Sequence, residues 1–355
     1  MDSPFKFLDA YQKDDRERFF GRERETAQLY NAVFASNLTL LYGASGTGKT
    51  SLINCGLGNK FYDTDWLPLF IRRNDNVNDS LEQAVNQRMI SDNNPDFSKK
   101  SIADKLQLLY LDYYKPIYLI FDQFEELYIL GKPAEQHLFH QNIARLLRSD
   151  LQAKVLLVIR EEWIAYLNEF EKIVPSLFDN RLRIERMNDP NVYRVISGSC
   201  RYANIEVQEP GKTIMQIIEN LRDKHERVDL TNLQVYLDRL YRGYQENSPN
   251  DKPEKIIFNP DLVNQVGKID NVLSQFLDEQ IFRIEAELQS RGVKNAKGLP
   301  LEILFSLVTE DGTKQALPAT NILDNLPKNR NIDQADLEYC LQEFQRIKLL
   351  RQVEG

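Results

Sequence analysis

The feature that most constrains this chain is the stretch at residues 43–50, which reads Gly-Ala-Ser-Gly-Thr-Gly-Lys-Thr. It matches the pattern G-x-x-x-x-G-K-[ST], in which glycines let successive backbone N–H groups turn inward around an anion. An apolar run at residues 38–42 precedes it, and a helix-compatible segment begins at Thr50. Strand, glycine-rich loop and helix follow in the order that a phosphate-binding loop requires. We therefore predict such a loop, rather than a glycine-rich turn that binds no phosphate.

The chemistry of a phosphate-binding loop assigns roles to its side chains. Lys49 is expected to reach the β- and γ-phosphates, and the Thr50 hydroxyl to hold Mg²⁺. Asp122 ends the apolar run 117–121, where its carboxylate would anchor the same Mg²⁺ through the water shell of the ion. ATP or ADP with Mg²⁺ are thus the expected cofactors. The predicted nucleotide-binding residues of the loop are Gly43, Ser45, Gly46, Thr47, Gly48, Lys49, Thr50 and Ser51.

Two glutamates close to Asp122 are candidates for the general base. Either Glu125 or Glu126 could orient and polarise the attacking water. The alternative is that they are acidic residues favoured at the start of a helix by its dipole. Many ATPases carry a glutamate directly after the Mg²⁺ aspartate, where this chain has Gln123. We therefore expect slow hydrolysis.

Arg160 ends the apolar run 155–159 and is expected at the same sheet edge as the loop. From there its guanidinium could contact the γ-phosphate and sense its presence. An ion pair with Glu161, Glu162 or a carboxylate across the sheet is the alternative.

Composition and residue spacing argue against several other classes of protein. The net charge of −8 argues against a surface built for duplex DNA or an anionic membrane. The three cysteines lie far apart, which indicates buried thiols rather than disulfides or a zinc site. His137 and His140 lack a third ligand, so we expect a solvated pair. No apolar run approaches the roughly 18 residues of a membrane span, no export signal is visible, and we expect a cytoplasmic protein without a membrane partner.

Alternating apolar runs and helical patterns predict a doubly wound α/β sheet of parallel strands. One strand-like run falls between the loop and Asp122, which would put the two motifs on non-adjacent strands, as in the additional-strand, AAA+-like division of P-loop NTPases. The predicted strands are residues 38–42, 66–71, 117–121, 155–159 and, more weakly, 182–184. The predicted helices between them are residues 80–89, 102–113, 135–147 and 161–170.

Strand-like runs disappear after residue 187, and helical patterns continue to the end of the chain. A helix-turn-helix spacing near the C-terminus, with a β-type ending at residues 349–353, suggests a winged-helix module. The predicted later helices are about 190–204, 211–226, 230–246, 269–288, 299–308 and 332–350, with a turn at 311–312 and one further helix between that turn and residue 332. The predicted domains are a P-loop nucleotide-binding domain (1–188), a helical lid (189–268) and a winged-helix domain truncated at its wing (269–355).

The order of these motifs resembles the STAND class of P-loop NTPases, signal-transduction ATPases related to AAA+ and NACHT/NB-ARC ATPases. It is most similar to the bacterial novel-STAND subgroup. The sequence Phe-Phe-Gly-Arg-Glu at residues 19–23 resembles the entry motif of that subgroup, which implies that Phe20, Gly21 and Arg22 line the adenine site. Further resemblances are the acidic strand end 122–127, the sensor strand 158–160, the segment 175–187, and a lid-helix start at 230–234 that packs against the base.

The resemblance implies a switch whose ADP form is closed and whose ATP form is open and self-associates. Many bacterial members resemble antiviral defence proteins that oligomerise when they sense a foreign protein. Members also carry an effector domain and a sensor domain, so we expect an excised module that lacks both, with an unknown protein trigger. Physically, the γ-phosphate must bind one arrangement of core and lid better than the other.

Two functions from other classes stay open. An AAA+ initiator- or transposition-type ATPase would bind DNA through its winged helix. The acidic balance, and the absence of a helix dense in Lys and Arg, count against a nucleic-acid partner. A catalytically inactive module that binds ATP only for interaction is the third possibility.

Overall fold

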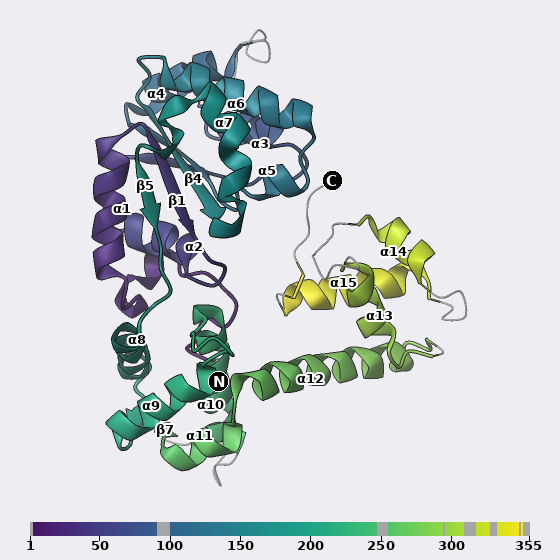
Figure 1. Ribbon diagram of the computed structural model, residues 1–355. Coiled ribbons are helices and arrows are strands. Elements are labelled where there is room, and N and C mark those ends of the chain that lie inside the picture. The colour runs from purple at the N-terminus through teal and green to yellow at the C-terminus, as the bar shows by residue number, and fades with distance from the viewer. Residues whose placement is uncertain are drawn as a thin grey trace. The chain divides into compact units, whose positions relative to one another are not determined.

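The computed structural model describes residues 3–90, 100–246, 255–293, 295–308, 317–326, 332–347 and 349–350. The chain divides into two compact units, Met1–Gln265 and Val266–Glu354 (Figure 1). The further division of the first unit at residue 188 stays a prediction.

A five-stranded parallel sheet forms the centre of the first unit, with the strand order β2-β3-β4-β1-β5. All five predicted strands are present. Because β4 lies between β1 and β3, the loop and Asp122 follow non-adjacent strands, which confirms the additional-strand, AAA+-like core. The strands are β1 (Leu38–Gly43), β2 (Leu67–Ile71), β3 (Ile117–Phe121), β4 (Ala153–Arg160) and β5 (Arg181–Arg183).

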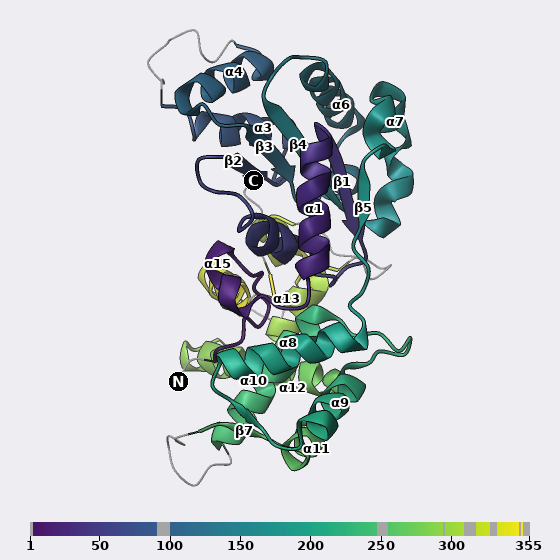
Figure 2. The ribbon, with the colours of Figure 1, turned by 90° about the vertical axis from the view of Figure 1, so that its left-hand side faces the viewer.

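Side chains of the strands alternate between two apolar layers, as the pleat of a strand requires. Leu119 faces a layer with α3, α4, α6 and α7, whereas its neighbours Tyr118 and Ile120 face α1 and a π-helical segment. Figure 2 shows α1 lying across its face of the sheet. Burial on both faces explains why the strands read as continuous apolar runs. The helices are α1 (Glu23–Ala35), α2 (Lys49–Ser51), the π-helical Leu52–Leu57, α3 (Val77–Asn86), α4 (Ile102–Tyr113), α5 (Glu126–Ile129), α6 (Pro133–Leu147) and α7 (Asn168–Ile173).

The predicted helix at residues 161–170 is two elements, the 3₁₀ helix Glu161–Leu167 and then α7. Two further 3₁₀ helices, Lys13–Arg18 and Pro175–Phe178, complete the short helical elements around the sheet.

A helical part follows the sheet, beyond the edge where α2 begins (Figure 1). The expectation that strands end after residue 187 was wrong, since two short strands pair in parallel here. At two residues each, they are too short to produce an alternating pattern. The N-terminal Phe5 packs against the rings of Tyr241 and Phe258 in this part. Its elements are α8 (Asp189–Tyr202), β6 (Glu206–Val207), α9 (Pro210–Leu221), α10 (Leu230–Glu246), β7 (Ile257–Phe258) and α11 (Pro260–Val266).

In the described part of the second unit, the named secondary-structure elements are all helices. Its apolar core includes Leu288, Ile303, Leu337 and Phe344. The turn predicted at 311–312 and residues 351–353 of the expected β-type ending lie outside the described residues, so the winged helix stays a prediction. The helices are α12 (Ile269–Ser290), α13 (Leu299–Ser306), α14 (Ala319–Asn325) and α15 (Gln334–Arg346).

The cysteines and the hydropathy of the helices bear on the expectations drawn from composition. Cys55, Cys200 and Cys340 are all buried free thiols, as predicted. Across the described ranges, no helix has the length and apolar character needed to cross a membrane.

The Phe139 side chain should carry a large share of the stability of the first unit. It is fully buried on α6, with its ring 5.0 Å from that of Phe121 and 5.3 Å from that of Phe124. We expect Phe139→Ala to lower the free energy of unfolding by about 3–5 kcal/mol, measured by urea denaturation. The neighbouring Leu138 is 46% exposed, so Leu138→Ala is the control and should cost less than about 1 kcal/mol. Equal losses would contradict this placement of the core.

Candidate active site

The phosphate-binding loop connects β1 to α2, the arrangement that the motif predicts. Gly46 has φ of 73° and Gly48 φ of 83°, a left-handed conformation that glycine adopts without strain. Thr47 holds the turn by donating its hydroxyl to the Ala44 carbonyl at 2.9 Å. The Lys49 ammonium donates to the carbonyls of Gly43 and Ala44 at 2.7 and 2.8 Å.

Burial lowers the pKa of Lys49, while the charges of Glu125 and Asp122 oppose that shift. The ammonium therefore stands in a partly desolvated place between its own loop and two carboxylates. A cation in such surroundings binds an added anion more strongly than it would in open water.

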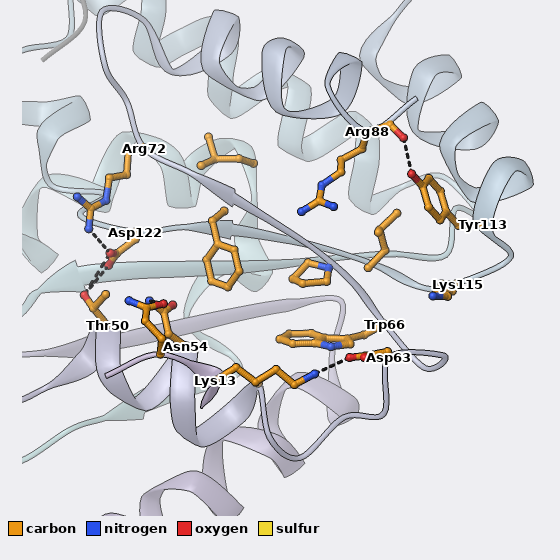
Figure 3. A pocket seen from close by; sticks show the side chains of 16 residues that line it. Lys13, Thr50, Asn54, Asp63, Trp66, Arg72, Arg88, Tyr113, Lys115 and Asp122 are labelled. Atoms are coloured by element: carbon orange, nitrogen blue, oxygen red, sulfur yellow. Dashed lines mark hydrogen bonds and ion pairs between the residues drawn. The ribbon is translucent and has the colours of Figure 1, made fainter. Parts of the chain in front are cut away.

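Thr50 and Asp122 meet as the sequence predicts. The Thr50 hydroxyl donates to the Asp122 carboxylate at 3.1 Å, and the Arg72 guanidinium pairs with the same carboxylate at 3.1 Å (Figure 3). A hydroxyl and a carboxylate are hard oxygen donors, the set that Mg²⁺ prefers, so these residues fit the metal.

Arg72 was missed in the sequence. It is the first residue after β2, and β2 pairs with β3 so that Ile71 lies opposite Phe121. A charged residue directly after a predicted parallel strand was the available signal, since the carboxyl ends of such strands share one edge.

Glu125 reaches this edge by a turn after Asp122. Gln123 has φ of 57°, and the Phe124 N–H donates to the Val158 carbonyl at 2.8 Å, which brings Glu125 beside the end of β4. One oxygen of Glu125 lies 2.9 Å from Arg160 Nε, and the other accepts the Arg160 backbone N–H at 3.2 Å. Of the alternatives for Arg160, the ion pair with a carboxylate across the sheet is therefore present. Its role as a γ-phosphate sensor stays a prediction.

The two candidate bases differ in their surroundings. Burial raises the pKa of Glu125, against the opposing charges of Arg160 and Lys49. Burial also raises the pKa of Glu126, with Arg72 opposing and Glu125 reinforcing the shift. A base with a raised pKa accepts a proton more readily near neutral pH. Glu125 differs in being fixed by an ion pair to the neighbouring strand.

Residues of the predicted entry motif tie the loop to the helical part. Arg22 is buried, and its Nη2 donates to the carbonyls of Thr47 and Glu185 at 2.9 Å each. Its Nε is a buried donor without a hydrogen-bond partner in the described part of the chain. The Phe20 ring packs on Gly198 of α8, where an added Cβ would lie 2.7 Å from the ring.

Gly21, Ser45 and Ser51 are the remaining predicted nucleotide-binding residues. Gly21 lies against α8, where an added Cβ would come 2.9 Å from Val195. The Ser51 hydroxyl accepts the Tyr11 N–H at 3.1 Å, and Ser45 is exposed. That Phe20, Gly21 and Arg22 bind adenine stays a prediction.

A pocket of about 550 Å³ opens along the edge strand β2 (Figure 3). Thr50, Arg72 and Asp122 form one end of its lining, and Tyr113 lies at the other. Residues 43–48 do not line it. We therefore place the phosphate site at the loop itself, and the pocket is a separate space that meets it at Thr50 and Asp122.

The expectation of a solvated histidine pair was wrong for His140. This side chain is buried, its ring stacks on Phe170 at 4.3 Å, and it shares a hydrogen bond of 3.2 Å with Tyr128. Burial lowers the pKa of His140 to about 4, so it is a neutral core residue at pH 7. No cluster of three or more metal-ligating His, Cys, Asp or Glu side chains occurs among the described residues.

Together, the sheet order, the loop after β1 and the acid after β3 define a P-loop nucleoside triphosphatase. Residues 4–354 match the family model Novel STAND NTPase 1. The chain belongs to this family, and it is an NTP-hydrolysing enzyme. A comparison with curated proteins found no significant match.

A comparison with solved structures found matches at low sequence identity. The ORC2 protein of Aeropyrum pernix, solved as ADPNP–ADP complexes, is 15% identical with a TM-score of 0.52, over 92% of this chain and 94% of that one. A Walker-type ATPase of Pyrococcus abyssi is 17% identical with a TM-score of 0.48, over 96% and 93%. The ORC2 likeness shows a shared fold alone.

Removing the partner of Glu125 should move the pH dependence of NTP turnover. Arg160 favours the charged form of Glu125, so Arg160→Met raises the pKa of that carboxyl further. A general base works above its pKa, and we expect the acid limb of the pH profile of kcat/KM to move to higher pH. Arg183→Met is the control, because Arg183 pairs with the more exposed Glu161. An acid limb that does not move would contradict a role for Glu125 as the base.

Proposed function

We propose that this chain is the ATP-driven switch module of a STAND signalling protein, whose ADP or ATP state controls oligomerisation and effector activation. The observation that carries this proposal is the contact between the start of α10 and the phosphate-binding loop. The Leu230 N–H donates to the Gly46 carbonyl at 3.3 Å. A helix seated on the loop that holds the phosphates is able to respond to which nucleotide is bound.

The chemistry proposed is hydrolysis of the β–γ anhydride of ATP. Thr50 and Asp122 would hold Mg²⁺, which neutralises phosphate charge when bound. Lys49 supplies the adjacent cation. Glu125 accepts the proton of the attacking water as the new oxygen–phosphorus bond forms and the bond to ADP breaks. We assign this step to Glu125 rather than Glu126, because the ion pair with Arg160 fixes its position.

Slow turnover is part of the proposal. The chain has Gln123, with φ of 57°, in place of a glutamate directly after Asp122. The candidate base, Glu125, is three residues after Asp122. That base is also held by Arg160 at 2.9 Å, and a carboxylate that is paired with a cation is a weaker base. A switch needs a triphosphate state that lasts.

The resemblance to STAND proteins motivates the proposed partners. We propose self-association on activation, attachment to an effector and a sensor domain, and release by a protein trigger, as in bacterial antiviral defence. A winged-helix fold for the second unit, and a cytoplasmic location, belong to the same proposal. Family membership favours this function over an initiator-type ATPase, and the net charge of −8 gives no reason to propose a nucleic-acid partner.

Nucleotide affinity should depend on Lys49. We expect Lys49→Ala to weaken ATP binding by about ten- to a hundredfold, because one charge-assisted contact contributes about 1.5–3 kcal/mol. Isothermal titration calorimetry measures the affinity, and circular dichroism checks that the fold persists. Lys13→Ala is the control, since Lys13 pairs with Asp63 on the surface. Unchanged ATP affinity in Lys49→Ala would contradict the site.

Assembly should follow the nucleotide. We expect the β,γ-imido analogue of ATP with Mg²⁺ to raise the mass of the chain in size-exclusion chromatography with light scattering, whereas ADP leaves it unchanged. Lys49→Ala should give the ADP result with either nucleotide. The same mass in both nucleotides, or fast multiple turnover by the wild-type chain, would contradict a switch.

A further inference from the structure

Asp229 places a carboxylate directly against the phosphate-binding loop. It precedes α10, and a Cβ built on Gly46 would lie 1.7 Å from its Oδ2 and 2.6 Å from its Oδ1. The next residue, Leu230, also lies against the loop, since its Cδ1 is 3.4 Å from a Cβ built on Gly48. The first residues of the helix therefore rest on the loop, at a position that no side chain on Gly46 would allow.

The charge of this carboxylate is not balanced locally. Its Oδ1 accepts the Thr231 N–H at 2.7 Å, which caps the helix. In the part of the chain that the structure describes, Asp229 forms no ion pair, and the N–H groups of the loop do not donate to it. Oδ2 thus brings a half-buried negative charge to the backbone that a polyphosphate would approach.

Like charges that approach in a half-buried place repel each other more strongly than they do in water. ATP carries about one more negative charge than ADP, and the added charge lies on the γ-phosphate. An acid on the loop therefore opposes the triphosphate more than the diphosphate. A ligand shifts a conformational equilibrium only through such a difference in affinity between two states.

We propose that Asp229 is a specificity-determining residue of the nucleotide site, which makes the loop prefer ADP to ATP while the start of α10 rests on Gly46. This inference depends on the proposed function, because it assumes that the loop binds adenine nucleotides. To the proposed function it adds one residue and one physical effect. Repulsion between Asp229 and a bound triphosphate would favour the departure of α10 from the loop.

A merely structural role for Asp229 is capping of α10. Asn and Asp are equally good N-caps, and the side-chain oxygen of Asn can still accept the Thr231 N–H. Asp229→Asn therefore removes the charge and keeps the cap. Asp223→Asn is the matched control, since the Asp223 carboxylate accepts the N–H groups of His225 and Arg227 in an exposed turn.

The test is the ratio of two affinities, measured by calorimetry with ADP and with the β,γ-imido analogue of ATP. We expect Asp229→Asn to shift this ratio toward the triphosphate roughly tenfold, equivalent to about 1.4 kcal/mol. Asp223→Asn should leave the ratio unchanged. In the wild-type chain, higher salt should shift the ratio in the direction of Asp229→Asn, because salt screens the repulsion.

The outcomes separate this inference from the proposed function. A ratio in Asp229→Asn within twofold of the wild-type value would overturn the inference, as would equal gains for both nucleotides. In either case the wild-type chain still binds nucleotide, and the proposed function stands. A wild-type chain that binds neither nucleotide would overturn both.

Discussion

The register of the parallel sheet is the constraint on which the site depends. Gly43 at the end of β1 lies opposite Arg160 at the end of β4, and Phe121 at the end of β3 lies opposite Leu157. Parallel strands bring their carboxyl ends to one edge, so the loop, Asp122 and Arg160 converge there from distant parts of the sequence. A shift of one residue in any pair would turn each apolar side chain to the opposite face. The two apolar layers therefore fix the site as well as the fold.

Charge at this edge is arranged in pairs that an anionic ligand would disturb. Arg72 holds Asp122 and Arg160 holds Glu125, while Lys49 donates to loop carbonyls. Burial lowers the pKa of Lys49 and raises the pKa of Glu125, which favours the neutral form of each group. Such a cluster responds to an added phosphate because its own pairs compete with the ligand. In our proposal the carboxylate of Asp229 would also respond to the nucleotide, since it directly precedes α10 and contacts the loop.

Prediction succeeded where the pattern lay in adjacent residues. The strand at 117–121 and the helix at 102–113 match the structure at both ends, because buried strands are short continuous apolar runs, and Ser101 caps α4 through its hydroxyl. It failed where tertiary contacts override local pattern. β6 and β7 are held by pairing with each other. His140 is neutral mainly because it is buried beside Phe170 and Tyr128. No feature of residues 161–170 signalled that the helix would begin as a 3₁₀ turn.

The sequence by itself determined the phosphate-binding loop, the apolar strands and the acid after β3. Each of these features is a pattern of adjacent residues, so it can be recognised without knowing which distant residues it contacts. Only the tertiary structure decided which groups meet across the chain. Arg72 reaches Asp122, Glu125 pairs with Arg160, and Asp229 rests on Gly46, and each of these contacts joins residues far apart in sequence. Spacing along the chain carries no information about such distances. They are set by strand order, by the turn at Gln123 and by the course of the chain into α10.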